Sequence, residues 1–410
     1  MAAAGSPLIY PRVMIGFGRR LLDEFPLDPH VTYLNHGTVG VTPRRVLAAQ
    51  QAIRDEIERQ PSRFLLRELT APATSVGMPS RERPRLRIAA DRVAAFLGAR
   101  GYDLVFTDNV TAGANAVLRS FPLEPGDEIL LTDLGYGGVT NAARFAAREK
   151  GAAVNTVAIP YPFRADAIVD AIDAAAGPRT RIAIVDHISA DSALVLPIAA
   201  IASRLRARGV AVLVDGAHVP GAIPLAIAGL GVDWYVANLH KWMWVPRGSG
   251  ILWAAPDRQA SLQPPVVSWG LDQGFTTTFD MPGTRDPSQH LAAPAAIALF
   301  EEWGTEAIQR HNHALAMRAA HHLAERWDVP FETPEDLIGT MATVTLPQVL
   351  GSEREDALRL RDTLLFEHAI EVPVHAYRGQ LRARVSAQVY NDMDDIERFA
   401  ATVLSLARRP

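Results

Sequence analysis

Apolar and polar residues follow two different periods between residues 100 and 255. Short β-branched runs, such as "YDLVFTD", "DEILLTD", "AAVNTVAI" and "RIAIVDH", alternate with alanine-rich segments of helical period, and "VAVLVDG" closes the series. Continuous apolar strands that alternate with helices indicate an α/β domain with a mostly parallel sheet covered on both faces. Most runs end in polar residues, and in such sheets ligands bind beyond the carboxyl ends of the strands. The polar strand ends are Asp108-Asn109, Asp133, Asp186-His187 and Asp215.

The pattern changes after residue 289. Long amphipathic helical stretches, at about 290–326, 355–369 and 393–408, surround short strands such as "MATVTLP" and "LRARVS". This pattern predicts a smaller C-terminal α+β domain over residues 286–410. It would follow a large α/β domain over residues 31–285, and residues 1–30 are expected to form an irregular N-terminal arm.

Composition and charge exclude several classes of partner. The chain has 410 residues, 48% of them hydrophobic, which is enough for two domains with a real core. The net charge is −4, and the densest basic stretch, "RERPRLR" (81–87), includes Glu82 and is predicted to be solvated. This argues against nucleic-acid binding. The N-terminal residues lack the order of a secretory signal and no apolar run could span a bilayer, so we expect a cytoplasmic protein without a membrane partner.

The chain contains no cysteine, which excludes disulfides, thiolate metal sites and thiol nucleophiles. Histidines 311, 313, 321 and 322 lie on one predicted helical stretch without a matching carboxylate pattern. A solvated helix face explains them better than a metal site. We therefore expect no metal.

Only two of the 41 lysine and arginine residues are lysines, Lys150 and Lys241. Lys241 lies in "NLHKWMWVPRGSGILW" (238–253), directly before an apolar stretch that begins with Trp242. An amine forms a Schiff base with a carbonyl compound when it is deprotonated and confined, whereas a guanidinium stays charged. We interpret Lys241 as such an amine; the alternative is a surface lysine beside a core aromatic stripe.

Two strand ends supply partners for that chemistry. Asp215, in "VLVDGAHVPG" (212–221), ends an apolar strand, where it would either cap a helix or meet a positive group such as a protonated ring nitrogen. Thr111, in "TDNVTAGAN" (107–115), begins a predicted helix, and helix N-termini bind phosphate. The spacing is not that of a P-loop, and an ordinary N-cap remains the alternative. Together with Lys241, these features specify pyridoxal 5′-phosphate (PLP).

The sequence resembles the class V aminotransferase family of fold-type I PLP enzymes and, within it, the isopenicillin N epimerase-like branch. The resemblance covers nearly the whole chain and depends on the order and spacing of its motifs. These are "YLNHGTVGVTP" (33–43), "TDNVTAGAN" (107–115), "VDHISADSALVLPI" (185–198), "VLVDGAHVPG" (212–221), "NLHKWMWVPRGSG" (238–250), "MPGTRDPS" (281–288) and "LRARVSAQVYN" (381–391).

The resemblance implies a catalytic set of Lys241, Asp215 and His218. Lys241 would form the Schiff base with the cofactor, and Asp215 would bind the pyridinium nitrogen. His218 would lie near the ring or its phenolic oxygen. The remaining implied cofactor-binding residues are Thr111 with the backbone of Val110 and Ala112, His240, Ser189, Tyr136 and Thr284.

Among these residues, Tyr136 would stack on the pyridine ring, although it could also be an ordinary turn tyrosine. Thr284 would reach the phosphate of a neighbouring subunit, which implies a homodimer with shared active sites. Arg384 would pair with the α-carboxylate of an amino-acid substrate, a task suited to guanidinium; the alternative is an exposed arginine. Asn35 and His36 would line the substrate entrance, although His36 could instead be a structural turn residue.

For the reaction, the resemblance favours epimerase or racemase chemistry at Cα of an amino acid. A carbon–sulfur lyase, of the kind that cleaves hercynylcysteine sulfoxide, and a class V aminotransferase are the alternatives. A thiol-dependent cysteine desulfurase is excluded by the lack of cysteine. A catalytically silent member that uses its dimer surface for binding is a further alternative. An epimerase should have a second base facing Lys241, for which His218, His36 and Tyr136 are candidates.

Overall fold

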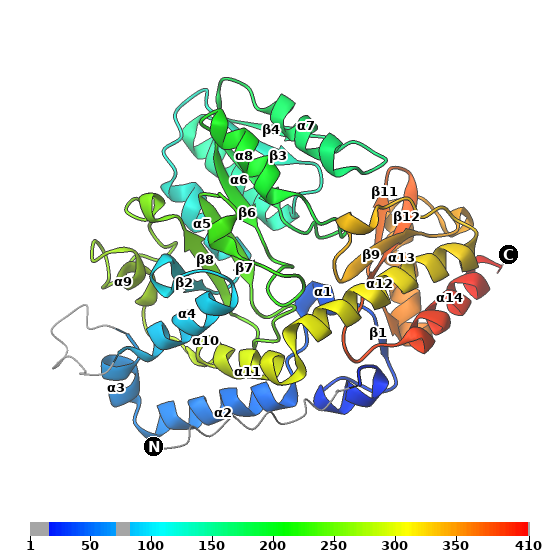
Figure 1. The fold of residues 1–410 in the computed structure, drawn as a ribbon, viewed down its shortest axis with the longest axis horizontal. Coiled ribbons are helices and arrows are strands. Elements are labelled where there is room, and N and C mark those ends of the chain that lie inside the picture. The colour runs from blue at the N-terminus through cyan, green and yellow to red at the C-terminus, as the bar shows by residue number, and fades with distance from the viewer. Residues whose placement is uncertain (1–15, 71–82, 409–410) are drawn as a thin grey trace, which may run out of the picture.

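The computed structural model describes residues 16–70 and 83–408, and its centre is a seven-stranded sheet (Figure 1). β8 runs antiparallel to both of its neighbours, β2 and β7, and all other pairs in this sheet are parallel, so the predicted mostly parallel α/β sheet is confirmed. In spatial order the strands are β2 (Leu104–Thr107), β8 (Gly250–Ala254), β7 (Trp234–Asn238), β6 (Ala211–Asp215), β5 (Thr180–Asp186), β3 (Glu128–Thr132) and β4 (Ala153–Val157).

Both faces of this sheet are buried, because alternate residues of a strand point to opposite faces. In β6, Val212 and Val214 belong to one apolar core, whereas Ala211 and Leu213 belong to another. This explains why the strands are continuous apolar runs in the sequence. The helices of this region are α4 (Arg85–Phe96), α5 (Val110–Ser120), α6 (Gly137–Lys150), α7 (Ala165–Ala175), α8 (Ile198–Ala207) and α9 (Phe275–Asp280).

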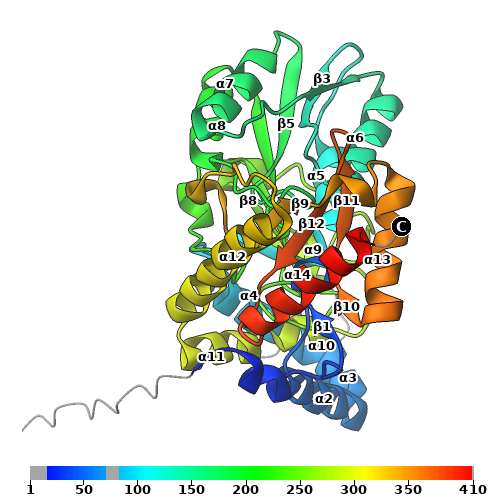
Figure 2. The same cartoon turned by 90° about the vertical axis from the view of Figure 1, so that its right-hand side faces the viewer.

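A second, antiparallel sheet has the order β11-β12-β9 and a core of its own. Long helices cover it, and Figure 2 shows α12 and α14 crossing in front of it. The strands are β9 (Met341–Thr345), β11 (Val374–Tyr377) and β12 (Gln380–Ser386), and the helices are α12 (Thr305–Trp327), α13 (Arg354–His368) and α14 (Met393–Ala407). The preceding α10 (Ser288–Leu291) and α11 (Ala293–Trp303) pack against α2 (Arg44–Arg59) and α4. The domain boundary at residue 285 stays a prediction.

The N-terminal segment crosses from one part of the molecule to the other. A 3-10 helix, Arg19–Glu24, precedes β1 (Thr32–Tyr33), which pairs in parallel with β10 (Ile370–Glu371). α1 (His36–Val39) and α2 follow, and α3 (Pro61–Arg63) ends this run. Residues 1–15 of the predicted arm lie outside the described residues. Among the residues that the structure does describe, none of the helices has the length and apolar character needed to cross a membrane.

One detail of the sequence interpretation is wrong. The basic stretch 81–87 begins outside the described residues, but its last residue, Arg87, is buried rather than solvated. The Arg87 guanidinium pairs with the Asp280 carboxylate at 2.6 Å and donates to the carbonyl oxygens of Gly101 and Leu104. Arg87 is therefore buried because a carboxylate from a distant segment pairs with it.

Lys150 has a structural role that separates it from Lys241. Its Nζ lies at the C-terminal end of α5, where it donates to the carbonyl oxygens of Leu118 (3.4 Å), Arg119 (3.1 Å) and Phe121. The last carbonyls of a helix lack partners within the helix and carry partial negative charge. A flexible ammonium with three donors suits this position.

We expect Lys150→Met to lower the free energy of unfolding by about 1–2 kcal/mol, because carbonyls at the end of α5 lose a charged donor. Lys150→Arg keeps the charge and should lose less. Urea denaturation followed by circular dichroism measures both values. A Lys150→Met protein as stable as the wild type would show that the lysine does not cap α5.

Candidate functional site

Two buried carboxyls lie side by side at the carboxyl edge of the large sheet. Asp186 ends β5 and Asp215 ends β6, and the two residues are paired in the strand register. Asp186 Oδ2 accepts the Tyr136 N–H at 3.2 Å, and Asp215 Oδ1 accepts the Ala217 N–H at 2.9 Å. Asp215 Oδ2 is buried without a partner. Burial raises the pKa of Asp215 to about 6, and burial together with the Asp215 charge raises the pKa of Asp186 well above its usual range.

Lys241 follows the end of β7 by three residues and is buried beside His218, with Nζ 3.0 Å from Nε2 of the ring. The Trp242 indole N–H donates to His218 Nδ1 at 3.4 Å. A neutral imidazole that accepts at Nδ1 carries its proton on Nε2. That proton then points at the Lys241 nitrogen, an arrangement that favours the deprotonated amine, whose lone pair can accept it.

Electrostatics act in the same direction as this hydrogen-bond pattern. Burial and, to a smaller extent, the charge of Arg384 lower the pKa of Lys241 to about 8, whereas the charges of Asp215 and Asp186 oppose this shift. Burial and the Lys241 charge also lower the pKa of His218 well below its usual range. The site therefore contains a lysine that loses its proton easily and a histidine that stays neutral.

The start of α5 presents backbone donors close to this group. Asn109 caps the helix by accepting the Ala112 N–H at 3.0 Å, and Asn238, the last residue of β7, accepts the Val110 N–H at 2.9 Å. Among the hydrogen bonds of residues 16–70 and 83–408, none uses the Thr111 N–H. The N-terminus of an eleven-residue helix with such a donor can bind an anion.

Tyr136 lies beside this helix start. A Cβ at Gly138 would be 2.7 Å from the Tyr136 ring and 3.4 Å from Thr111 Oγ1, so the ring and the hydroxyl meet at one place. The Tyr136 side chain is 46% exposed, and the backbone N–H of this residue is held by Asp186. The structure thus brings Thr111, Tyr136 and the buried carboxyls together.

Arg384 is a buried cation without a counter-ion. It is 3% exposed, and no carboxylate of the described residues lies within 4.0 Å of its guanidinium. Its Nη2 donates to Thr38 Oγ1 (2.7 Å) and Asn35 Oδ1 (3.3 Å), Nη1 donates to the Ala190 carbonyl, and Nε has no partner. Burial lowers the pKa of Arg384 to about 10. An unpaired buried charge is costly, which suits a site that binds an anion.

His36 has a supporting position rather than an open one. Its ring nitrogens contact Tyr390 Oη (2.8 Å) and the Lys241 carbonyl (3.0 Å), and the side chain is fully buried. Burial lowers its pKa to about 3. His36 therefore fixes the backbone at Lys241 and has no free nitrogen with which to take up a proton.

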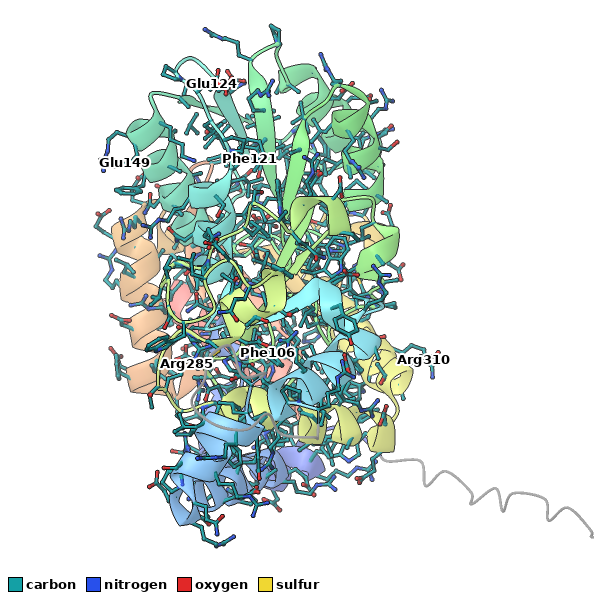
Figure 3. The ribbon with its side chains drawn as sticks, turned by 90° about the vertical axis from the view of Figure 1, so that its left-hand side faces the viewer. Phe106, Phe121, Glu124, Glu149, Arg285 and Arg310 are labelled. Atoms are coloured by element: carbon teal, nitrogen blue, oxygen red, sulfur yellow. The ribbon has the colours of Figure 1, made fainter. Side chains whose placement is uncertain are left out.

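The remaining sequence-predicted residues are Ser189, His240 and Thr284, and among the hydrogen bonds of the described residues none joins Ser189 or His240 to the side chains of Lys241, Asp215 or Arg384. The Ser189 hydroxyl makes its hydrogen bonds within its own turn, to Ser192 Oγ (2.5 Å) and the Leu194 backbone. His240 Nδ1 contacts the Ser249 carbonyl at 3.2 Å, and burial lowers the pKa of His240 to about 4. Thr284 is exposed; the next residue, Arg285, labelled in Figure 3, pairs with Asp108 at 2.6 Å.

Two contributors were missed from the sequence. Asn238 lies in the same motif as Lys241, and its position at the end of β7 was the available signal. Trp242 was expected in the apolar surroundings of Lys241, but its hydrogen bond to His218 was not. Thr38 lies in the "NHGTV" segment and contacts Arg384, but no local pattern relates two residues so far apart in the chain.

The arrangement fits PLP. Asp215 Oδ2 is an unsatisfied buried acceptor for a protonated ring nitrogen, and the free donor at the start of α5 suits a phosphate. Lys241 supplies a buried amine of lowered pKa for the aldehyde. These residues could hold the ring, the phosphate and the reactive carbon of one molecule.

The raised pKa of Asp215 predicts a cost to the protein without cofactor. The folded-state pKa lies above the unfolded one, so the carboxyl binds its proton more tightly when folded. The free energy of unfolding should then fall as pH rises from about 4 to about 6. We expect Asp215→Asn to stabilise the cofactor-free protein at pH 7.5 by roughly 1–3 kcal/mol and to flatten this dependence. Denaturation curves at several pH values test this; a destabilised variant would contradict it.

The chain is similar in sequence to a known family and to several of its members. The family model "Aminotransferase class-V" matches residues 77–399. Isopenicillin N epimerase of Amycolatopsis lactamdurans is 33% identical over 94% of this chain and 98% of its own. A probable chloroplastic L-cysteine desulfhydrase of Arabidopsis thaliana is 29% identical over 93% of this chain and 84% of its own.

Solved structures share the fold at lower identity. A C-DES mutant with glycine covalently linked to its PLP cofactor superposes with a TM-score of 0.74 at 22% identity, over 95% of this chain and 99% of that one. The matched family model, the fold and a site that fits the cofactor agree. This chain belongs to the class V aminotransferase family of fold-type I enzymes that use pyridoxal 5′-phosphate.

Proposed function

We propose that the protein removes and returns the proton at Cα of an amino acid, as an isopenicillin N epimerase-like enzyme. Two buried groups carry the proposal. One is the Lys241 amine, which loses its proton easily, and the other is the Arg384 guanidinium, which has no counter-ion among the described residues. The two are close enough for the Arg384 charge to lower the pKa of the lysine. An amino-acid carboxylate on Arg384 would bring its Cα into the region of that amine.

When bound, PLP withdraws electrons from Cα and makes its proton acidic. Asp215, whose Oδ2 has no partner among the described residues, would hold the protonated ring nitrogen by charge. Lys241 takes the Cα proton, and the His218 N–H holds the lysine nitrogen in place. Arg384 orients the substrate through its α-carboxylate. The start of α5 anchors the phosphate.

Epimerisation needs a second proton carrier, and Tyr136 fits this role best. His36 has both nitrogens occupied, and His218 contacts Lys241 itself. Lys241 follows β7, whereas Tyr136 follows β3; β6, which ends in Asp215, lies between those strands. Along the edge of the sheet, Lys241 and Tyr136 therefore follow strands on opposite sides of the strand that ends in Asp215. The half-exposed phenol is the group in this chain that we assign to returning the proton.

Proton NMR in D₂O tests the reaction. With a panel of amino acids, including S-substituted cysteines and their sulfoxides, the holoenzyme should exchange the α-proton of its substrate and accumulate the D-form. Lys241→Ala should abolish exchange. Tyr136→Phe should keep exchange of the L-form but slow D-form accumulation by about 10²–10⁴-fold, the usual contribution of a general acid.

The outcomes separate the candidates. Pyruvate and ammonia without a D-product would make the protein a β-eliminating carbon–sulfur lyase, the reaction that the desulfhydrase relative favours. Formation of a keto acid with an aminated cofactor would indicate a transaminase. A Tyr136→Phe enzyme that epimerises at the wild-type rate would remove Tyr136 from the proposal.

We also propose that the enzyme works as a homodimer in which Thr284 reaches the phosphate of the other subunit. Large apolar side chains lie exposed in the segment 266–269: Trp269 is 69%, Val266 57% and Val267 54% exposed. Thr284 and Trp269 line the same open cavity, of about 180 Å³, with Leu65, Leu66, Leu69 and Met281. An exposed apolar patch of this kind favours association with another protein surface.

Trp269→Glu should convert the dimer into monomers and weaken PLP binding, because Thr284 then loses access to the second site. Phe366→Glu is the matched control, since Phe366 is 79% exposed on α13. Light scattering coupled to size exclusion gives the mass, and cofactor absorbance gives the affinity. A monomeric wild type, or a dimeric Trp269→Glu with unchanged affinity, would refute this assembly.

A further inference from the structure

A second arginine lies on the same face of β12 as Arg384. Side chains of a strand alternate, so Arg382, Arg384 and Ser386 share one face, whereas Leu381, Ala383 and Val385 face the core of the small sheet. On the neighbouring strand β11, His375 is opposite Arg382 in the register. Two guanidinium groups therefore extend from one strand toward the site, two residues apart.

Arg382 borders a cavity of about 80 Å³ next to the proposed substrate site. The cavity is enclosed by the turn that leads to Tyr136, through Gly135, and by the turn at Asp191 and Ser192. That second turn follows Ala190, whose carbonyl accepts from Arg384. The volume exceeds the ~10–15 Å³ that one water needs and leaves room for a small polar group.

Three buried polar atoms around this cavity can donate hydrogen bonds and have no hydrogen-bond partner. Arg382 Nε, Tyr377 Oη and His375 Nε2 are all buried without a hydrogen-bond partner. Such atoms are rare, since an unsatisfied buried polar group costs about 1–3 kcal/mol. A ligand that offers oxygen acceptors would satisfy all three.

The charges nearby leave Arg382 uncompensated. No carboxylate of the described residues lies within 4.0 Å of its guanidinium, which instead lies over the Tyr377 ring at 4.8 Å and the Tyr161 ring at 5.6 Å. Two acidic residues border the cavity, but both are exposed. Asp133 Oδ1 accepts the Ile159 N–H, and Asp191 Oδ1 is 3.6 Å from His375 Nε2. The aromatic rings hold the arginine in position without neutralising it.

We propose that this cavity binds the far end of the substrate side chain, and that this end carries a carboxylate. The proposal rests on the proposed function, in which Arg384 binds the α-carboxylate. Residues two apart on a strand are separated by about 7 Å. The substrate would therefore be an amino acid whose side chain ends in a carboxylate several bonds away from Cα.

Binding measurements on the holoenzyme test this site without turnover. Isothermal titration compares glutarate and adipate, each with its monoamide. The monoamide lacks one negative charge of the diacid but keeps its shape. We expect the dicarboxylate to bind about 10–100-fold more tightly than the monoamide, as a charge-assisted hydrogen bond would provide. Equal affinities for acid and amide at both lengths would overturn the proposal.

Variants then locate the effect. Arg382→Gln should abolish the preference for the dicarboxylate, whereas Arg382→Lys should restore part of it. Arg378→Gln is the control, because Arg378 also lies over Tyr161 and Tyr377, is exposed and does not border the cavity. A preference that survives Arg382→Gln would refute the role of Arg382, and thermal melting would show whether Arg382 only supports the fold.

Kinetic measurements of α-proton exchange test the carboxylate site separately from the proposed function. In α-proton exchange, Arg382→Gln should raise the KM for L-glutamate about tenfold or more and leave that for L-glutamine unchanged. Exchange with glutamate and glutamine at equal KM in the wild type would refute the carboxylate site alone. If no amino acid exchanges its α-proton, the proposed function fails, and the dicarboxylate titration still decides whether the anion site exists.

Discussion

Ionisable groups from the carboxyl edge of the large sheet and from β12 of the small sheet lie close together, and the rest of the site depends on how their charges are balanced. Lys241, Asp215, Asp186 and Arg384 are all buried, yet none of them makes a direct ion pair with another. Burial disfavours the charged form of each group. It lowers the pKa of the lysine and the arginine and raises that of the two carboxyls. The edge is therefore an unsatisfied environment that a bound ring nitrogen, phosphate and carboxylate would complete.

The backbone around Lys241 is packed closely enough to hold this arrangement. Gly40 has a φ of 68°, and a Cβ there would lie 1.9 Å from the His240 carbonyl oxygen. Gly221 has a φ of 86°, and a Cβ there would lie 2.6 Å from the Trp242 carbonyl oxygen. Side chains at either position would push against the segment that carries Lys241. These close approaches, together with the contact from His36 to the Lys241 carbonyl, restrict the position of the backbone at Lys241.

The sequence predicted the large sheet and its edge because both depend on local signals. Continuous apolar runs that end in Asp186 and Asp215 reveal buried parallel strands, and the scarcity of lysine drew attention to Lys241. Contacts between distant segments could not be predicted in this way. The pairing of β1 with β10, the burial of Arg87 by Asp280 and the contact of Thr38 with Arg384 each join residues that no period relates. The same limit hid the Trp242–His218 bond, although both residues lie in recognised motifs.

The ionisation of Lys241 tests the central claim most directly. Because the chain has only two lysines, protein labelled with ¹⁵N-lysine gives two Nζ signals, and Lys150→Arg assigns them. In the cofactor-free protein, the Lys241 signal should titrate near pH 8, because burial and Arg384 disfavour its charge. A midpoint near the ordinary lysine value of about 10.4 would contradict the account. It would mean that burial in this site does not favour the neutral amine, and that the charge balance proposed for this site is wrong.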